Sequence, residues 1–399
     1  MKNFNKDLLV VLASNSSHYK HAAMAYQKNK ILKYFLTTIF LKERNIYKIF
    51  PKIDKLFNSR YLKGLNPNLV KSLYSSELKS IYMKHFSKTS ISEYYRINNE
   101  HFGKKVYKKL LNKNFDIFHF VSGLGLESIT YSKSIGAKVI CDQRGAHFFC
   151  AISQIMNEFN NTGKYWLHPE SAFTDRLMSE YDQSDYIIVN SNYTKSSFIK
   201  AGFNKNKIKV IHLGVDNDSF SPCLQKSTKI FKLIFIGSIY PAKGIEYLLR
   251  AWEKLSLPES ELVIIGGEDK YFNIKKIKNV KLLPHLSHLE ISRVLKESTI
   301  MVLPSIDESF GLVGLEGMSS GLPLITTNNC GVSEIIIDGY NGYTVPARNV
   351  EKLAAKIKLL YDDRKLLSEM SKNARATAIE YSWDSYGDKL VEYVKMVHS

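Results

Sequence analysis

Short apolar runs alternate along the first half of the chain with longer segments that have the spacing of amphipathic helices. Six of these runs are rich in β-branched and aromatic residues and have the length of strands. They are residues 7–14, 34–40, 116–122, 137–143, 185–191 and 208–214. Alternation of this kind is typical of a parallel sheet that helices cover on both faces.

The pattern breaks near residue 220. Residues 216–229, DNDSFSPCLQKSTK, are polar, contain a proline and show no periodicity, which is typical of a linker. A second alternating series follows, with strands predicted at residues 231–238, 261–267, 280–284, 299–305 and 323–327. The predicted fold class is therefore α/β, with two doubly wound domains, residues 1–220 and 221–383, that face each other across a cleft.

Length and composition agree with this prediction. A chain of 399 residues is too long for one typical core, and 44% hydrophobic with 24% charged residues indicates a globular protein. The longest apolar runs fall far short of the roughly 20 residues of a transmembrane helix, and no signal peptide is expected. The four cysteines form no CxxC pair, which predicts free thiols in a cytoplasmic protein. They are Cys141, Cys150, Cys223 and Cys330.

Positive charge is concentrated in one part of the chain. The formal net charge is +18, and residues 28–113 hold twenty Lys/Arg against five Asp/Glu. A basic field of this size attracts nucleic acid, an anionic membrane surface or phosphorylated substrates, although a Lys-rich composition alone would also produce it. Aromatic residues in the segment could add contacts with a membrane interface. They are Tyr47, Phe50, Phe57, Tyr61 and Tyr82.

Residues 306–323, IDESFGLVGLEGMSSGLP, carry two glutamates, Glu308 and Glu316, with seven residues between them. The helix that follows the preceding strand is expected to begin near Phe310 or Gly311. Glu308 then lies in the loop at the carboxyl edge of the sheet, and Glu316 lies about two turns into the helix.

The start of this predicted helix has the features of a phosphate site. Its first backbone N–H groups lack partners within the helix, and the helix dipole favours an anion beside them. These groups belong to Ser309, Phe310, Gly311 and Leu312. Because a carboxylate accepts hydrogen bonds from sugar hydroxyls, we expect Glu308 to hold a transferred sugar and Glu316 to hold a ribose, with the N–H groups on a diphosphate.

The stretch ESFGLVGLE resembles the E-x7-E motif of the retaining family-4 glycosyltransferases of the GT-B fold. The likeness extends through residues 321–345 and includes FIGSIYPAKGIEYLLRAW at 235–252 and the segment 179–220. It is strong from about residue 180 to 350 and thinner before residue 135. The resemblance implies a GT-B fold whose last helix, residues 384–399, packs back on the first domain.

The resemblance also implies an activity. The chain would transfer a sugar, with retention, from a nucleotide-diphosphate sugar to a hydroxyl of a saccharide or lipid-linked saccharide, with no cofactor other than that co-substrate. Together with the basic segment, this predicts a role in surface polysaccharide synthesis and peripheral attachment to the inner face of an anionic membrane. No nucleic-acid partner is expected.

On the donor side, the resemblance assigns further residues. Lys243 of the KG loop would contact the diphosphate and offset negative charge on the leaving phosphate. Gly237 ends the strand before it, and Ser238 stands where many relatives carry an arginine. Leu283 and His285 lie at the strand end where relatives hold the base through main-chain atoms, which leaves uracil and guanine equally possible.

On the acceptor side, the resemblance places a catalytic histidine, His147, after the strand at residues 137–143, facing the donor sugar. Arg144 would support it or bind phosphate, with a structural ion pair as the alternative. In the first loop, Ser17 and His18 stand near the position of a glycine pair in many relatives and are candidates for contact with donor sugar or acceptor.

No metal site is predicted, because the sequence has no DxD-type acid pair in a suitable loop, and a metal-independent reaction is expected. The sequence also has no GxSxG motif and no P-loop. Two other functions remain open at this point. One is a sugar-nucleotide 2-epimerase of the same architecture, and the other is a non-enzymatic basic nucleic-acid-binding protein.

Overall fold

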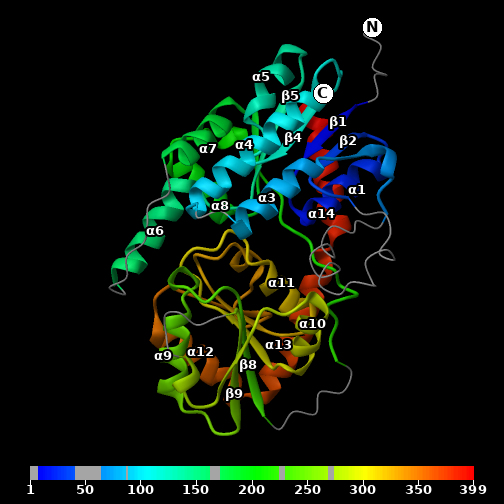
Figure 1. Cartoon of the computed structure of the whole chain (residues 1–399). Helices are drawn as coiled ribbons and strands as arrows, with labels where there is room; N and C mark the ends of the chain where they lie inside the picture. Colours follow the sequence, from blue (N-terminus) through cyan, green and yellow to red (C-terminus); the bar gives the residue numbers. More distant parts are fainter. Residues whose placement is uncertain (1–7, 41–63, 87–88, 162–170, 224–229, 268–273) are drawn as a thin grey trace, which may run out of the picture.

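Two parallel sheets, one in each half of the chain, organise the structure (Figure 1). The computed structural model describes residues 8–40, 64–86, 89–161, 171–223, 230–267 and 274–399. Helices cover both faces of each sheet, and the two domains meet at the loops between them (Figure 1). The predicted α/β class with two doubly wound domains is confirmed.

The N-terminal sheet has seven parallel strands in the order β3-β2-β1-β4-β5-β6-β7. The strands are β1 Val10–Ala13, β2 Leu32–Thr37, β3 Val70–Ser72, β4 Ile117–Val121, β5 Lys138–Gln143, β6 Tyr186–Val189 and β7 Ile208–Val210. The helices are α1 Lys20–Lys28, α3 Tyr74–Phe86, α4 Ile91–Leu110, α5 Leu126–Ser134, α6 Phe148–Asn161, α7 Ser171–Gln183 and α8 Asn192–Lys200. All four residues of β1 are buried, because layers on both faces exclude water from a central strand.

The C-terminal sheet has six parallel strands in the order β10-β9-β8-β11-β12-β13. The strands are β8 Phe231–Ile236, β9 Ser260–Ile265, β10 Val280–Leu283, β11 Ile300–Leu303, β12 Leu324–Thr327 and β13 Gly342–Val345. The helices that follow in sequence are α9 Ile245–Leu255, α10 His288–Glu297, α11 Leu312–Ser319, α12 Val350–Asp362, α13 Arg364–Glu380 and α14 Trp383–His398. In both sheets the order reverses at one point, between β1 and β4 and between β8 and β11.

Serine side chains start several of the helices. Ser90, Ser191 and Ser287 are the N-caps of α4, α8 and α10, and each side chain accepts a hydrogen bond from the backbone N–H three residues on. In α10 the Glu290 side chain returns the bond to the Ser287 backbone, which completes a capping box. These caps fix the starts of the three helices, two of which, α8 and α10, follow strands.

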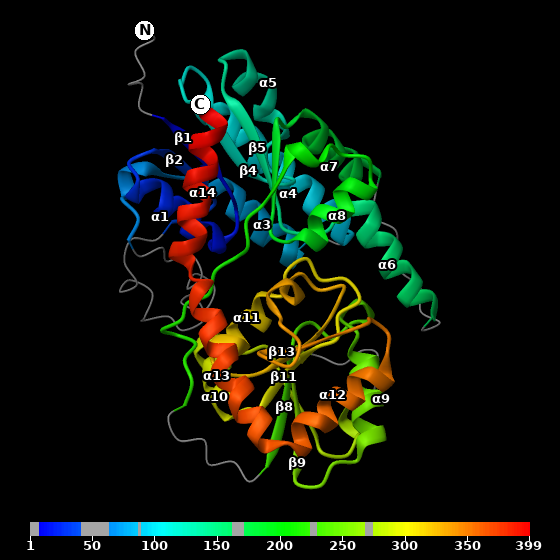
Figure 2. The ribbon, with the colours of Figure 1, turned by 180° about the vertical axis from the view of Figure 1, so that it is seen from behind.

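The last helix, α14, leaves the C-terminal domain and lies along α1 on the N-terminal domain (Figure 2). Leu390 and Val394 of α14 are fully buried in the same apolar cluster as Tyr26 of α1. The chain therefore crosses between the domains twice. The crossings touch, because a Cβ on Gly214 would lie 2.4 Å from the backbone N of Trp383, so only glycine fits there.

Candidate active site

The two loops that carry Lys243 and Glu308 leave the C-terminal sheet side by side. The Lys243 loop follows β8, and the Glu308 loop follows β11. β8 and β11 are neighbours at the point where the strand order reverses. Ligands of open α/β sheets bind at the carboxyl ends of the strands at such a switch point, since the loops there diverge and leave a crevice.

Close backbone contact joins these loops. Gly244 follows Lys243 with φ 67°, and a Cβ on it would lie 1.9 Å from the carbonyl oxygen of Pro304. Only glycine tolerates both the left-handed conformation and this approach. The carbonyl of Ala242 then accepts a hydrogen bond of 2.9 Å from the Ile306 N–H. The KG sequence therefore holds the first loop against the second.

Lys243 and Glu308 form an ion pair between the loops, through Nζ and Oε2. Their side chains are 23% and 21% exposed. Burial alone would lower the pKa of Lys243, but the Glu308 carboxylate raises that pKa above its ordinary value. Lys243 therefore carries its charge at neutral pH.

The backbone of Glu308 is fixed on both sides. Its N–H donates to the carbonyl of Asn329 at 3.0 Å, and its own carbonyl accepts from the Gly331 N–H at 2.9 Å. These bonds tie the loop to the segment after β12 and leave the carboxylate as the part of Glu308 that can respond to a ligand.

Helix α11 begins at Leu312, with Gly311 as its N-cap, one or two positions later than predicted. Among the described residues, none accepts a hydrogen bond from the N–H groups of Ser309, Phe310, Gly311 or Leu312. The predicted anion site at this helix start therefore has its donors available. The side chain of Ser309 has a role that the sequence did not predict. Its hydroxyl donates to the carbonyl of Arg144 in the other domain.

Glu316 is buried, with 4% of its surface exposed. Burial raises the pKa of its carboxyl to about 8, so the group is largely protonated at neutral pH. A titratable side chain in reach is that of the exposed His288, whose Nδ1 lies 3.9 Å from Oε1. A buried acid of this kind has hydrogen-bonding capacity left for a ligand.

The residues that were predicted to lie near the nucleotide base also lie at this edge of the sheet. Gly237 follows β8, and its N–H donates to the carbonyl of Ile265 at 2.9 Å. Leu283 ends β10, and its carbonyl accepts from the Gly266 N–H at 3.4 Å, while His285 lies against Gly267. The carboxyl ends of β8, β9 and β10 are thus linked in a row, with Ser238 next to Gly237.

Arg144, at the end of β5, lies in a buried polar network of the N-terminal domain. Its guanidinium donates to both carboxylate oxygens of Asp142, at 2.8 and 2.9 Å, and to the hydroxyls of Tyr19 and Tyr386. Asp142 also contacts His119. Burial alone would raise the pKa of Asp142, but Arg144 and His119 hold that pKa below its ordinary value. A structural ion pair was the alternative role predicted for Arg144, and the structure contains that pair, between Arg144 and Asp142.

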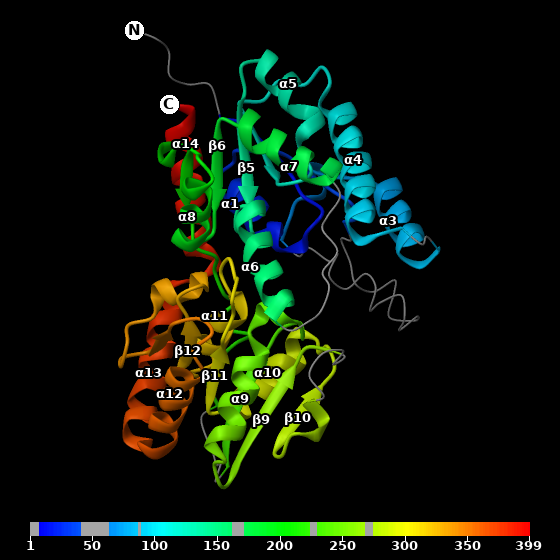
Figure 3. The ribbon, with the colours of Figure 1, turned by 90° about the vertical axis from the view of Figure 1, so that its left-hand side faces the viewer.

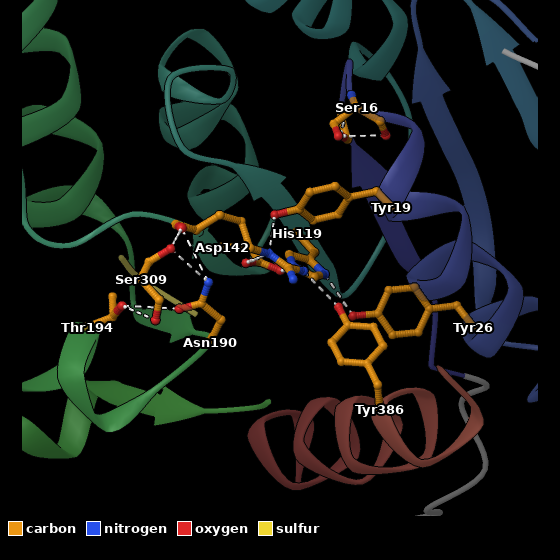
Figure 4. Close-up of polar contacts among 11 residues, drawn as sticks. Ser16, Tyr19, Tyr26, His119, Asp142, Asn190, Thr194, Ser309 and Tyr386 are labelled. Carbon is orange, nitrogen blue, oxygen red and sulfur yellow. Dashed lines mark hydrogen bonds and ion pairs between the residues drawn. The ribbon is translucent and has the colours of Figure 1, made fainter. Parts of the chain in front are cut away.

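Figure 4 shows how far this network reaches. Tyr26 on α1 meets His119 on β4, with 2.8 Å between the tyrosine hydroxyl and Nδ1, and Tyr386 comes from α14. Because β5, α1 and α14 all contribute, the network attaches the returning helix to the first domain. The sequence contains no local signal for it, since residues bonded to each other in it are up to 242 positions apart.

From the sequence, His147 was predicted to face the donor sugar, but in the structure it is buried in the N-terminal domain. Its ring is 2% exposed and lies among the aromatic rings of the N-terminal domain. These belong to Phe149, Tyr181, Phe198 and Phe203, with centroid distances of 5.0–5.8 Å. No described residue bonds to either ring nitrogen. The structure does not bring His147 into contact with Lys243 or Glu308.

The first loop contributes a surface residue. His18 lies in the short 3-10 helix Ser17–Tyr19 after β1 and is exposed. Desolvation by neighbouring groups, followed by the electrostatic effects of Arg144 and His288, lowers the pKa of His18. Since His288 belongs to the other domain, groups of both domains act on the pKa of His18.

Residues that the sequence analysis missed close the cleft. Ser191 donates to the carbonyl of Ser309, and Asn190 contacts the Ser309 hydroxyl at 3.4 Å. The Tyr193 hydroxyl donates to Asp307 at 2.6 Å, next to Glu308. Asn190 and Ser191 directly follow β6, so their position at a strand end is a signal that could have found them.

A second set of contacts lies at the two sides of the cleft. Glu334 accepts from the Tyr193 N–H at 2.8 Å and contacts His212 at 2.9 Å. Helix α6 extends from the N-terminal domain toward α9, as Figure 3 shows, and there Glu158 pairs with Arg348 and accepts from Tyr247 at 3.1 Å. The domains are therefore in direct contact.

The described residues hold no evident metal centre and no membrane-spanning helix. They contain no group of three or more His, Cys, Asp or Glu side chains that could hold a metal ion. Within the same ranges, no helix combines the length and apolar character needed to cross a membrane. None of the four cysteines is in a disulfide.

Comparisons with known proteins agree with this geometry. Residues 216–377 match the family model of glycosyl transferases group 1, and residues 88–219 match that of glycosyltransferase family 4. Sucrose-phosphate synthase of Thermosynechococcus elongatus superimposes with a TM-score of 0.73 over 98% of this chain and 99% of that one, at 15% identity. The chain has the GT-B fold.

Other GT-B structures and curated relatives give the same result. Anabaena HepE, solved in complex with UDP, has a TM-score of 0.67 and 14% identity over 98% of this chain and all of that one. An uncharacterized glycosyltransferase of Methanocaldococcus jannaschii is 30% identical over 210 residues, which are 50% of this chain. The matched part spans 56% of that relative's length. The GT-B fold that the resemblance implies is thus confirmed, and glycosyltransferase family models match part of each domain.

Proposed function

We propose that the chain is a retaining glycosyltransferase that moves a sugar from a nucleoside-diphosphate sugar to a hydroxyl of a saccharide or lipid-linked saccharide. One observation carries the proposal: Lys243, Glu308 and the open N–H groups of α11 meet at the switch point of the C-terminal sheet. The glycosyltransferase family models over both domains support it. HepE, which shares the fold, has been solved with UDP and with UDP-glucose.

In this proposal the diphosphate competes with Glu308 for Lys243. The N–H groups of residues 309–312 and the Lys243 ammonium bind its oxygens, and Lys243 releases Glu308 toward the sugar. Glu316 accepts hydrogen bonds from the ribose hydroxyls, and the main chain around Leu283 and His285 holds the base. Gly237 and Ser238 lie between base and diphosphate.

The chemical step then needs no protein nucleophile. The bond from the sugar's anomeric carbon to the phosphate oxygen breaks, the acceptor oxygen attacks from the same face, and the leaving phosphate takes the acceptor's proton. Lys243 and the α11 N–H groups stabilise the charge that builds on that phosphate. Glu308 stabilises positive charge on the sugar, and the Tyr193–Asp307 bond holds the domains closed around both. The proposed reaction uses no metal.

Helix α3 suggests where a membrane would be bound, at the cytoplasmic face. Its residues Tyr74, Leu78, Tyr82 and Phe86 repeat every fourth position and are 58–75% exposed, so they form one apolar stripe. Ten Lys/Arg and three acids occur in residues 64–113, and each basic residue near an anionic surface contributes about 1 kcal/mol. The other aromatic residues named for this role, Tyr47, Phe50, Phe57 and Tyr61, lie outside the described residues.

Flotation with vesicles tests the membrane part. The chain should float with anionic but not neutral vesicles, less so at high salt, and Tyr82→Ser with Phe86→Ser should reduce flotation. A matched control replaces Ile337 and Tyr340, which are exposed on the C-terminal domain, by serine. Flotation that is indifferent to the α3 changes, or salt-insensitive, would contradict the assignment.

A two-part ligand experiment tests the activity. Thermal shift against nucleosides, nucleoside diphosphates and sugar nucleotides should show stabilisation that requires the diphosphate. Incubation of the recognised sugar nucleotide without acceptor should leave its sugar unchanged. An isomerised sugar would instead identify a 2-epimerase, and stabilisation by nucleic acid but by no nucleotide would sink the enzyme assignment.

A further inference from the structure

A second concave site lies mainly in the N-terminal domain, and its lining includes neither Lys243 nor Glu308. It is a cavity of about 660 Å³ between α6, α7 and α8. This is the size range of pockets that hold small molecules. Its walls combine aromatic faces with hydroxyl, amide and carboxylate groups. The residues that line it include His147, Phe149, Cys150, Tyr193, Lys200, Phe203 and Asn329.

His147 is the feature of this cavity that most needs a ligand. The imidazole is buried, yet neither Nδ1 nor Nε2 has a hydrogen-bond partner among the residues that the structure describes. A polar group left buried without partners destabilises a fold, so native proteins rarely keep one without a use. Burial lowers the pKa of His147, so the ring is neutral and offers one donor and one acceptor. That combination matches a hydroxyl group, which both donates and accepts.

The cavity is connected to the catalytic loop by two of its wall residues. Asn329 accepts the N–H of Glu308 at 3.0 Å, and Tyr193 donates to Asp307 at 2.6 Å. Asn329 is contributed by the C-terminal domain, whereas the other wall residues belong to the N-terminal domain. A molecule in the cavity therefore lies beside the loop that holds Glu308.

We propose that this cavity binds a neutral saccharide, the part of the acceptor next to the hydroxyl that reacts. Phe149 and Phe203 offer apolar faces to the sugar ring, His147 bonds a hydroxyl, and Asn329 and Tyr193 bond its neighbours. One lysine and one aspartate line the walls, so the site has no net charge that would select an anionic ligand. The identity of the occupant as an acceptor rests on the proposed function, whereas saccharide binding does not.

A stability measurement separates binding from structure at His147. His147→Phe removes the unbonded nitrogens and suits the surrounding rings, so the apparent Tm of the empty protein should rise. The same change should abolish retention of the whole chain on a column of immobilised maltotriose, cellotriose or chitotriose. His147→Gln, which keeps a donor and an acceptor, should retain part of the binding. A fall in Tm together with unchanged retention would overturn the proposal.

A covalent block gives an independent test. Cys150 lines the cavity, and Cys223→Ser removes the exposed thiol, which leaves Cys141 and Cys330 buried. A benzyl methanethiosulfonate adduct on Cys150 should remove trisaccharide retention, and a reductant should restore it. The Cys150→Ser protein treated in the same way is the control.

Nucleoside-diphosphate binding is measured on the same samples and should not change. A chain that binds nucleotide but retains no trisaccharide, or retains it despite the adduct, overturns the cavity assignment and leaves the proposed function intact. Retention that is lost with the adduct in a chain that binds no nucleotide supports the cavity and counts against the proposed function.

Discussion

The two domains have the same architecture but build their candidate sites in different ways. In the C-terminal domain, the main groups come from two loops that follow neighbouring strands, and short backbone bonds hold those loops together. In the N-terminal domain, Arg144, His119 and Tyr386 come from three distant parts of the chain. The C-terminal loops offer a ligand backbone N–H groups that bond to no described residue, and an ion pair that a ligand could separate. In the N-terminal network, the Arg144 guanidinium already bonds to Asp142, Tyr19 and Tyr386. We infer that the C-terminal domain binds the charged donor and that the N-terminal network mainly supports the structure.

The largest effect is expected at Glu308. Glu308→Gln keeps the shape but removes the charge that would stabilise the transition state, so the transfer rate at saturating donor should fall by roughly 100- to 1,000-fold, the loss typical of a removed electrostatic group. Affinity for the free nucleoside diphosphate should change little. Transfer at the unmodified rate would break the contrast between the domains, since the carboxylate of the Lys243–Glu308 pair would then have no role in the reaction.

Lys243 should give the next largest effect. Lys243→Ala should weaken nucleoside-diphosphate binding by about 10- to 100-fold, because one charge-assisted contact contributes about 1.5–3 kcal/mol. A nucleoside without phosphates should bind as before. Lys254→Ala, at an exposed lysine on α9, is the matched control and should leave both affinities unchanged. Equal weakening of both ligands by Lys243→Ala would argue against a phosphate role.

Glu316 should make stability depend on pH. Its pKa is about 8 in the folded protein against an ordinary 4.5, so between these values the folded state holds a proton that the unfolded state has lost. Its contribution is complete below about pH 4.5 and is lost as pH rises toward 8, at up to about 1.4 kcal/mol per pH unit. Glu316→Gln should flatten this decline in denaturant titrations at pH 5–8. An unchanged slope would show that the carboxyl is already ionised at pH 5.

The smallest effect concerns the supporting network. Tyr386→Phe removes one hydrogen bond to Arg144 and should lower the free energy of unfolding by about 1 kcal/mol. Nucleoside-diphosphate affinity, measured by calorimetry on the same protein, should stay constant. A large loss of that affinity would place the network in the donor site and remove the distinction between the two domains.

The difference between the domains also explains what the sequence could predict. Glu308, Lys243 and the start of α11 lie within short motifs at strand ends, so their shared location follows from local pattern and parallel topology. The partner of Arg144 on α14 and the contact between Ser309 and Ser191 depend on tertiary placement of segments that no local pattern relates. The same reason applies to His147, whose aromatic surroundings come from three separate helices and the loop after α8.

Strand prediction failed where strands are short. β3 has three residues and β13 has four, and neither has an alternation that separates it from a turn. The predicted first strand also extended beyond both ends of β1, because the apolar run continues through residues that lie outside the ladder. Neither error moves a residue of the candidate donor site.

The path of α14 has a consequence for synthesis. A ribosome makes the N-terminal domain first, and domains generally fold as units in that order. Here the apolar surface around Tyr26 is covered by residues that are translated only after the whole C-terminal domain. During synthesis, this apolar surface of the N-terminal domain therefore stays exposed to solvent, where chaperones can bind it or aggregation can begin. The C-terminal domain can complete its own core in that time. The domain that begins first is finished last.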